Sequence, residues 1–304
     1  MSGSAPAVGA APPLAPPRSR GRQLAADYFD LTKPKVQTLL LLSTVTTMEV
    51  AGSPSAGRVA LTCLGGYLSA GGAGAVNHYW DRDIDAQMKR TANRPVPSGR
   101  VSPAAALRFG FGLAAASFVL MTLTVGLLAA ALALSGFIGY VGVYTIGLKR
   151  RTPHNIVIGG AAGAVPPLVG WAATRGSLSW TAVYLFAIVF YWTPPHFWAL
   201  SLLMKDEYAA VGVPMLPVVK GEHETRRQIL LYTLLLYAIT QLPFCAGAFG
   251  GIYLVSSMIL GLGFVAGSVL LYRRADRRTA LRLYLFSMLY LALLFVSMVV
   301  DVKL

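Results

Sequence analysis

The sequence predicts an all-α fold, a polytopic membrane bundle of about nine transmembrane helices around a central cavity. Of the 304 residues, 55% are hydrophobic and only 12% are charged, whereas a soluble domain carries roughly 25% charged residues. The mean hydropathy is +0.59. Apolar runs long enough to cross a hydrocarbon core of about 30 Å recur along the chain. These observations exclude an ordinary soluble enzyme.

We expect residues 1–26 to form a disordered tail in front of one intramembrane domain, residues 27–304. The tail is rich in Ala, Pro, Gly and Ser and has no apolar core of the kind found in secretory signals. A mitochondrial transit peptide is the alternative, because Arg18, Arg20 and Arg22 precede the first acidic residue. The prolines argue against the amphipathic helix that such a peptide needs.

Nine spans follow the tail, with ends defined to within several residues. They are 35–53, 58–79, 103–120, 122–145, 156–174, 178–203, 229–249, 253–272 and 280–300. The stretch 103–145 is almost continuously apolar, and only its length requires a turn near Met121. Pro194 and Pro195 are expected to interrupt the sixth span, which favours a position for this span at the wall of the cavity.

The distribution of basic residues tests this assignment and orients it. All 26 Lys and Arg residues except Arg58, Arg175 and Lys303 fall on the side of the N-terminus. An excess of basic residues marks the cytoplasmic side, so we expect the N-terminus and the two long loops, after spans two and six, to be cytoplasmic. The net charge of +14 therefore reports orientation in a lipid bilayer and gives no reason to expect nucleic acid as a partner.

The second span ends in Asn77, Asp81 and Asp85, an N-x-x-x-D-x-x-x-D pattern. Residues four apart lie on one face of a helix, so three oxygen-bearing side chains would project into one cavity. Carboxylates at membrane depth are costly, and they repel each other without a cation between them. Mg²⁺ prefers oxygen ligands and bridges carboxylates to phosphates. The pattern predicts a magnesium site that binds a diphosphate; a solvated loop in which the acids pair with neighbouring basic residues is the alternative.

Basic residues after this pattern are candidates for contact with the diphosphate. Lys89, Arg90 and Arg94 follow the acids directly, and the guanidinium fork suits phosphate oxygens. In the loop after the sixth span, Asp206 and Glu207 offer a second acidic point, for a second metal ion or for ordering the loop. Adjacent residues do not share a helix face, so a simple carboxylate pair does not follow.

Four longer motifs carry a resemblance to a known family. They are DRDID-x-x-M-x-R-T-x-x-R-P at 81–95, TPHNIVIGGAAGAVPPLVGW at 152–171, YWTPPHFWAL at 191–200 and GVPMLPV at 212–218. With these motifs the chain, from Asp27 through the last span, resembles the UbiA superfamily of intramembrane prenyltransferases and, within it, the protohaem IX farnesyltransferase (haem O synthase) family.

The resemblance implies a nine-helix bundle whose cavity opens to the membrane, with Asn77, Asp81 and Asp85 holding Mg²⁺ on farnesyl diphosphate. It also implies that Lys149 and Arg150 help to bind the diphosphate. The implied reaction transfers the farnesyl group to a vinyl group of haem B, with hydration, and gives haem O. Many superfamily members have a second D-x-x-x-D, but here the spacing from Asp206 meets Ala210. Asp206, beside Glu207, is then the candidate second metal ligand.

Further expectations concern haem, partners and location. Of the four histidines, His196 and His154 are the candidates for ligating haem iron, and either could instead donate to a carboxylate. Pathway order makes haem A synthase an expected partner, and the bacterial cell membrane is the expected location.

Two other functions are compatible with parts of the sequence. A UbiA enzyme could prenylate a quinone or hydroxybenzoate precursor in place of haem. A membrane transporter would also contain intramembrane acids and a broken helix. A transporter of that kind predicts inverted repeats, whereas the two motif loops recur in the same membrane orientation.

Overall fold

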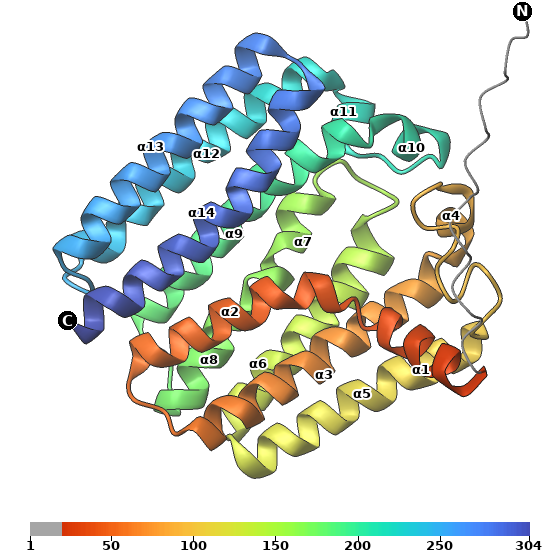
Figure 1. Ribbon diagram of the computed structural model, residues 1–304, viewed down its shortest axis with the longest axis horizontal. Coiled ribbons are helices and arrows are strands. Elements are labelled where there is room, and N and C mark those ends of the chain that lie inside the picture. Colours follow the sequence, from red (N-terminus) through yellow and green to blue (C-terminus); the bar gives the residue numbers. More distant parts are fainter. Residues whose placement is uncertain (1–19) are drawn as a thin grey trace, which may run out of the picture.

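The computed structural model describes residues 20–304, which form a bundle of helices with no strand in that range (Figure 1). The elements are α1 Arg20–Leu31, α2 Pro34–Ala51, α3 Ala56–Trp80, α4 Arg82–Gln87, α5 Pro103–Thr124, α6 Leu127–Ile138, the π-helix η1 Gly139–Leu148, α7 Asn155–Gly163, α8 Val165–Arg175, α9 Trp180–Leu203, α10 Lys205–Ala210, α11 Leu216–Val219, α12 Gly221–Cys245, α13 Gly251–Arg274 and α14 Arg277–Lys303.

Seven helical segments in this range are long and apolar enough to cross a membrane: α3, α5, α6 with η1, α7 with α8, α12, α13 and α14. Helices α2 and α9 correspond to the other two expected spans. Helix α9 has 24 residues, so at 1.5 Å per residue it extends about 36 Å. The prediction of an all-helical membrane bundle with about nine spans is confirmed.

The helix boundaries differ from the expected ones in three places. Residues 20–26, assigned to the tail, belong to α1, and residues 1–19 lie outside the described range. The turn expected near Met121 falls at 125–126, where Gly126 adopts a φ of 138° that glycine tolerates best. The fifth span is divided at Ala164, before a helix that has proline in its first turn.

Helix α9 is not interrupted at its two prolines, contrary to expectation. Pro194 and Pro195 both lie inside the helix and are buried. A proline within a helix removes one hydrogen bond to the carbonyl four residues earlier, so the cost is confined to two carbonyls. Neighbouring helices enclose this segment, and that packing maintains the helix.

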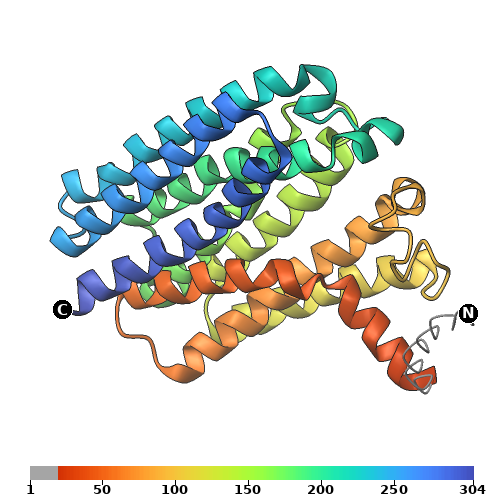
Figure 2. The same ribbon diagram turned by 45° about the horizontal axis from the view of Figure 1, so that its top comes forward.

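The long connections gather at one end of the bundle (Figures 1 and 2). Helix α4 and the following loop lie at the same end as α10 and α11, whereas the C-terminus and the α2–α3 connection lie at the opposite end. The two long loops therefore share one face, as the charge pattern predicted.

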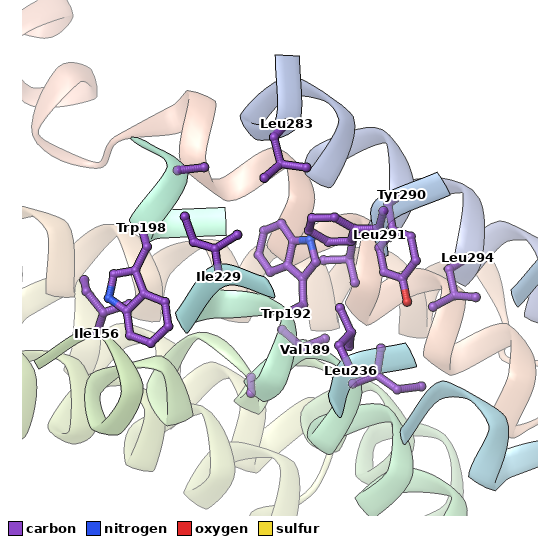
Figure 3. Close-up of a cluster of buried hydrophobic side chains, with 14 of the residues drawn as sticks. Ile156, Val189, Trp192, Trp198, Ile229, Leu236, Leu283, Tyr290, Leu291 and Leu294 are labelled. Carbon is purple, nitrogen blue, oxygen red and sulfur yellow. The ribbon is translucent and has the colours of Figure 1, made fainter. Parts of the chain in front are cut away.

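The largest apolar core surrounds α9 (Figure 3). Trp192 and Trp198 of α9 pack with Ile229 of α12 and with Tyr290 of α14, and all four are buried. The indole of Trp192 donates a hydrogen bond of 2.7 Å to the carbonyl of Ser287, so its polar edge is satisfied inside the core. This core fixes α9 between α12 and α14.

A second tight interface joins α3 to α5 through glycine. A Cβ atom placed on Gly72 would lie 2.5 Å from the carbonyl oxygen of Gly110, and one on Gly110 would lie 2.7 Å from that of Gly72. The two backbones approach this closely only because neither residue has a side chain.

Candidate functional site

The three expected metal ligands lie together at the end of α3. The amide of Asp81 donates to the carbonyl of Asn77 at 2.9 Å, and that of Asp85 to Asp81 at 2.8 Å, so the helical register continues into α4. Asn77 Nδ2 donates to Asp81 Oδ2 at 2.7 Å and to Thr145 Oγ1 at 3.2 Å. Asn77, Asp81 and Asp85 are 3%, 0% and 3% exposed. Their oxygens thus form one buried acidic group.

Cations from two other segments hold these carboxylates. Arg94 Nη1 lies 2.6 Å from Asp85 Oδ2. Lys149 forms an ion pair with Asp81, and Arg150 Nη2 lies 3.5 Å from the other oxygen of Asp81. Three of the five basic residues expected at the site are therefore in contact with the acids.

Lys89 and Arg90, the other two, are exposed. Among residues 20–304 neither forms an ion pair. The structure does not bring them onto the carboxylates, although Arg90 lies close enough to act electrostatically on Lys33 and Tyr208.

Lys33 also lies at the site, although the sequence indicated for it only a contribution to membrane orientation. It is the N-cap of α2, with φ 54° and ψ 56°. Its Nζ donates to Asn77 Oδ1 at 2.5 Å and to the Tyr140 hydroxyl at 3.3 Å. Burial of the ammonium, and then the nearby charge of Arg94, lower the pKa of Lys33 to about 8. The only indication in the sequence was that Lys33 directly precedes Pro34, the first residue of α2.

Asp83 lies outside the acidic group and anchors one of its cations. Both terminal nitrogens of Arg150 donate to its carboxylate, at 2.7 and 2.6 Å. This pairing holds the pKa of Asp83 at about 2, so the anchor is charged at every physiological pH. Arg150 also donates to the carbonyl of Trp80 at 2.9 Å, which orients its side chain toward Asp81.

The wall opposite α3 is a π-helix, η1, which the sequence did not predict. Its i→i+5 bonding continues into the loop, where the amide of Lys149 donates to the carbonyl of Tyr144 at 2.8 Å. With more than four residues per turn, Tyr140, Thr145 and Lys149 fall on one side, and all three contact Lys33, Asn77 or Asp81. Such helices are rare and occur frequently at functional sites.

Asp206, the expected second metal ligand, does not lie where the sequence placed it. Asp206 is exposed and lines a cavity of about 210 Å³ with Glu222, Asp276 and Arg277. Within residues 20–304 no three His, Cys, Asp or Glu side chains form a possible metal cluster, so Asp206 does not join Asp81 and Asp85. The assignment of Asp206 as a metal ligand is not supported by this placement, because its side chain turns toward α12–α14.

Glu207, the neighbour of Asp206, keeps a buried carboxylate oxygen without a hydrogen-bond partner. The next residue, Tyr208, lies in the electrostatic field of Arg90, Arg94, Glu207 and Asp85, and its pKa is raised mainly by burial. Helix α10 therefore turns Glu207 and Tyr208 toward the acidic group of Asn77, Asp81 and Asp85.

The donor set fits a hard divalent cation. Two carboxylates and one amide oxygen are ligand types that Mg²⁺ prefers, and buried carboxylates require a cation. Asn77, Asp81 and Asp85 would hold the ion. The surrounding ammonium and guanidinium groups would then be available to a phosphate ligand.

The two candidate haem ligands occupy unlike environments. His196 is stacked between Trp192 and Tyr284, with ring centroids 4.3 and 4.8 Å away, and its Nδ1 lies 2.7 Å from Ser287 Oγ. These contacts give it a packing role between α9 and α14. His154 is the exposed N-cap of α7 and makes no side-chain cap hydrogen bond.

Comparison with known proteins identifies similar chains over most of this length. The profile of the UbiA prenyltransferase family matches residues 39–294. Proteins named protoheme IX farnesyltransferase from a Roseiflexus species and from Thermus thermophilus are 53% and 54% identical over 91% and 93% of this chain. The chain spans about half the length of these two relatives, 52% and 47%. A relative of the same name from Symbiobacterium thermophilum is 52% identical over 94% of this chain and 97% of its own.

Solved structures share the fold at low sequence identity. A digeranylgeranylglyceryl phosphate synthase has a TM-score of 0.77 at 19% identity, covering 93% of this chain and 100% of that one. A UbiA homolog from Archaeoglobus fulgidus, bound to DMAPP and Mg²⁺, has a TM-score of 0.66 at 14% identity, covering 90% and 99%.

Proposed function

The chain belongs to the UbiA prenyltransferase family, and from that premise we propose that it transfers a farnesyl group from farnesyl diphosphate to a vinyl group of haem B. Hydration accompanies the transfer, and the products are haem O and diphosphate. Relatives that are 52–54% identical in sequence are named protoheme IX farnesyltransferase, and these names support haem as the acceptor.

One observation carries the diphosphate part of this proposal. Buried Asn77, Asp81 and Asp85 are surrounded by four basic side chains, Lys33, Arg94, Lys149 and Arg150. Two carboxylates could be neutralised by fewer cations than four. The surplus of positive charge suits a ligand with several negative charges.

The residues of the chain would act on the leaving group. The C1–O bond of farnesyl diphosphate breaks, and its electron pair departs with the diphosphate. Lys33, Arg94, Lys149 and Arg150 are fixed where that charge develops, and fixed charges in a water-poor site stabilise it without reorganisation. Mg²⁺, when bound, adds Lewis-acid stabilisation of the same oxygens.

The acceptor then completes the exchange. The β-carbon of the vinyl group bonds to the farnesyl C1, and water adds to the adjacent carbon and loses a proton. The rings of Tyr140 and Tyr144, 5.4 Å apart, lie beside the acidic group and could shield the allylic cation.

The test offers each acceptor separately. Purified protein in liposomes receives farnesyl diphosphate and Mg²⁺ with haem B, with a quinone precursor or with a hydroxybenzoate, and mass spectrometry identifies the product. We expect farnesylated, hydrated haem only. Prenylation of either of the other acceptors, with haem B unchanged, would contradict the proposal.

We also propose that the protein lies in the bacterial cell membrane with the α4 and α10 ends cytoplasmic, and that haem A synthase receives the product. The basic residues gathered at that end support the orientation. Crosslinking in membranes that contain both enzymes tests the transfer partner; absence of any crosslink would count against a direct complex.

A further inference from the structure

His78 lies in the last turn of α3, directly after Asn77, and is 2% exposed. Both ring nitrogens, Nδ1 and Nε2, are buried without a hydrogen-bond partner. Because the helical register continues into α4, His78 shares a side of this helix with Asp81 and Asp85, three and seven residues later. An unpartnered imidazole therefore flanks the acidic group.

A purely structural histidine looks different in this protein. His196 is equally enclosed, but its Nδ1 is bonded to Ser287 and its ring is stacked on both faces. Buried polar groups without partners are rare, and each one needs an explanation such as a role in binding or catalysis. His78 has two such atoms in one side chain.

The charges around His78 indicate which ligand it would meet. The positive charges of Lys33, Arg94 and Lys149 act on its ring. All three are cations, and each also contacts one of the site oxygens. Gly74, one turn earlier, packs against the carbonyl of Leu31 at the α1–α2 joint, with a Cβ distance of 2.9 Å. His78 thus points toward the side of α3 where Lys33 enters the site.

We propose that His78 donates a hydrogen bond from a ring nitrogen to an oxygen of the substrate diphosphate. A neutral imidazole always carries one N–H, so it can donate without adding a further charge to a crowded cationic pocket. This inference rests on the diphosphate part of the proposed function and does not depend on the acceptor.

The test measures binding of inorganic pyrophosphate with Mg²⁺ to the purified full-length protein by calorimetry, with no acceptor present. His78→Leu removes the donor, and His78→Gln keeps a donor in a similar volume. We expect leucine to weaken binding by about 10- to 100-fold, the range for a hydrogen bond to a charged group, and glutamine to restore most of it. His223→Leu, at an exposed histidine bonded to Tyr272, is the control and should bind as the unmodified protein does.

The outcomes separate this inference from the proposed function. If the unmodified protein does not bind pyrophosphate, the proposed function fails. If it binds and both His78 variants bind as tightly as the unmodified protein does, the inference is wrong. Should the leucine variant not fold, ¹⁵N spectra of the histidine rings decide: pyrophosphate must shift the His78 nitrogens, assigned by their loss in the glutamine variant, and an unchanged signal overturns the inference.

Discussion

At the scale of the residue, Lys33 shows how one backbone conformation places an ammonium group beside the acidic group. Its left-handed φ is uncommon for a residue with a side chain, and it turns the chain between α1 and α2 so that Nζ reaches Asn77. A helical conformation at this residue would direct the lysine elsewhere.

Replacing Lys33 by methionine keeps its length and removes its charge. We expect the Kd of pyrophosphate with Mg²⁺ to rise about 10- to 100-fold, because a charge-assisted hydrogen bond is lost. Lys35→Met is the matched control, since Lys35 is exposed two residues later, and it should leave binding unchanged. Equal losses in the two variants would show a general effect of charge.

Asp81 is the second residue whose role can be isolated. Asp81→Asn keeps the shape and removes the charge that pairs with Lys149 and would hold Mg²⁺. We expect kcat to fall at least about 100-fold, the scale of losing one electrostatic contact in a preorganised site, and chelation of Mg²⁺ to abolish turnover in the unmodified enzyme. Asp83→Asn, which affects only the anchor of Arg150, should cost much less; an equal loss would contradict the separation of roles.

At the scale of the element, the π-helix and the glycine contact determine where side chains arrive. Tyr140, Thr145 and Lys149 reach the site from one side of η1. In an α-helix, residues 140 and 149 would point in nearly opposite directions at 100° per residue. The close approach of α3 and α5 sets the position of the helix that carries Asn77.

Two glycines on α5 allow a matched test of that approach. Gly110→Ala would place a Cβ 2.7 Å from the backbone oxygen of Gly72, whereas Gly112→Ala meets nothing within 4 Å. We expect the first to destabilise the protein by about 1–3 kcal/mol, as overpacking does, and the second to be neutral or slightly stabilising. Thermal unfolding in detergent measures both, and similar values would mean that the interface is looser than described.

The N-cap of α14 predicts a pH dependence. Asp276 accepts hydrogen bonds from the Thr279 hydroxyl at 2.7 Å and the Thr279 amide at 2.8 Å, and these lower its pKa. A carboxylate whose pKa is lowered on folding stabilises the protein above its ordinary pKa of about 4, and this contribution is lost as the pH falls through the lowered value. Asp276→Asn keeps the capping oxygen but cannot ionise.

The melting temperature of the unmodified protein should therefore fall toward that of the asparagine variant as the pH decreases from about 6 to about 3. A constant difference between the two proteins over this range would exclude ionisation of Asp276 as the cause.

At the scale of the whole molecule, the two ends of the bundle carry different chemistry. The α4 and α10 end holds the acidic group and its cations. At the other end, Arg58 donates to the carbonyls of Ala173 and Val125, and Lys303 pairs with Glu49. Two of the three basic residues at that end are thus occupied by structural contacts.

Membrane orientation can be tested with two exposed serines. Ser98 follows α4, and Ser177 lies between α8 and α9. In a protein whose Cys63 and Cys245 are replaced by serine, Ser98→Cys should react with an impermeant maleimide only in inverted vesicles, and Ser177→Cys only in right-side-out vesicles. The reverse pattern would overturn the proposed orientation.

The sequence by itself determined the membrane class, the approximate spans, the shared face of the two loops and the buried acidic group. These follow from local properties: apolar length, the side on which charges accumulate and four-residue spacing. Arg94 could be assigned to the acidic group from the sequence because it lies only nine residues from its partner Asp85.

Tertiary structure alone decided which cations meet the acids and which helices stay whole. Lys33 and Lys149 reach the site from segments 44 and 68 residues away from their partners, and Asp206 turns away although its neighbour faces inward. Pro194 and Pro195 continue a helix because surrounding helices enclose it. Each of these outcomes depends on packing between distant segments, which no local pattern contains.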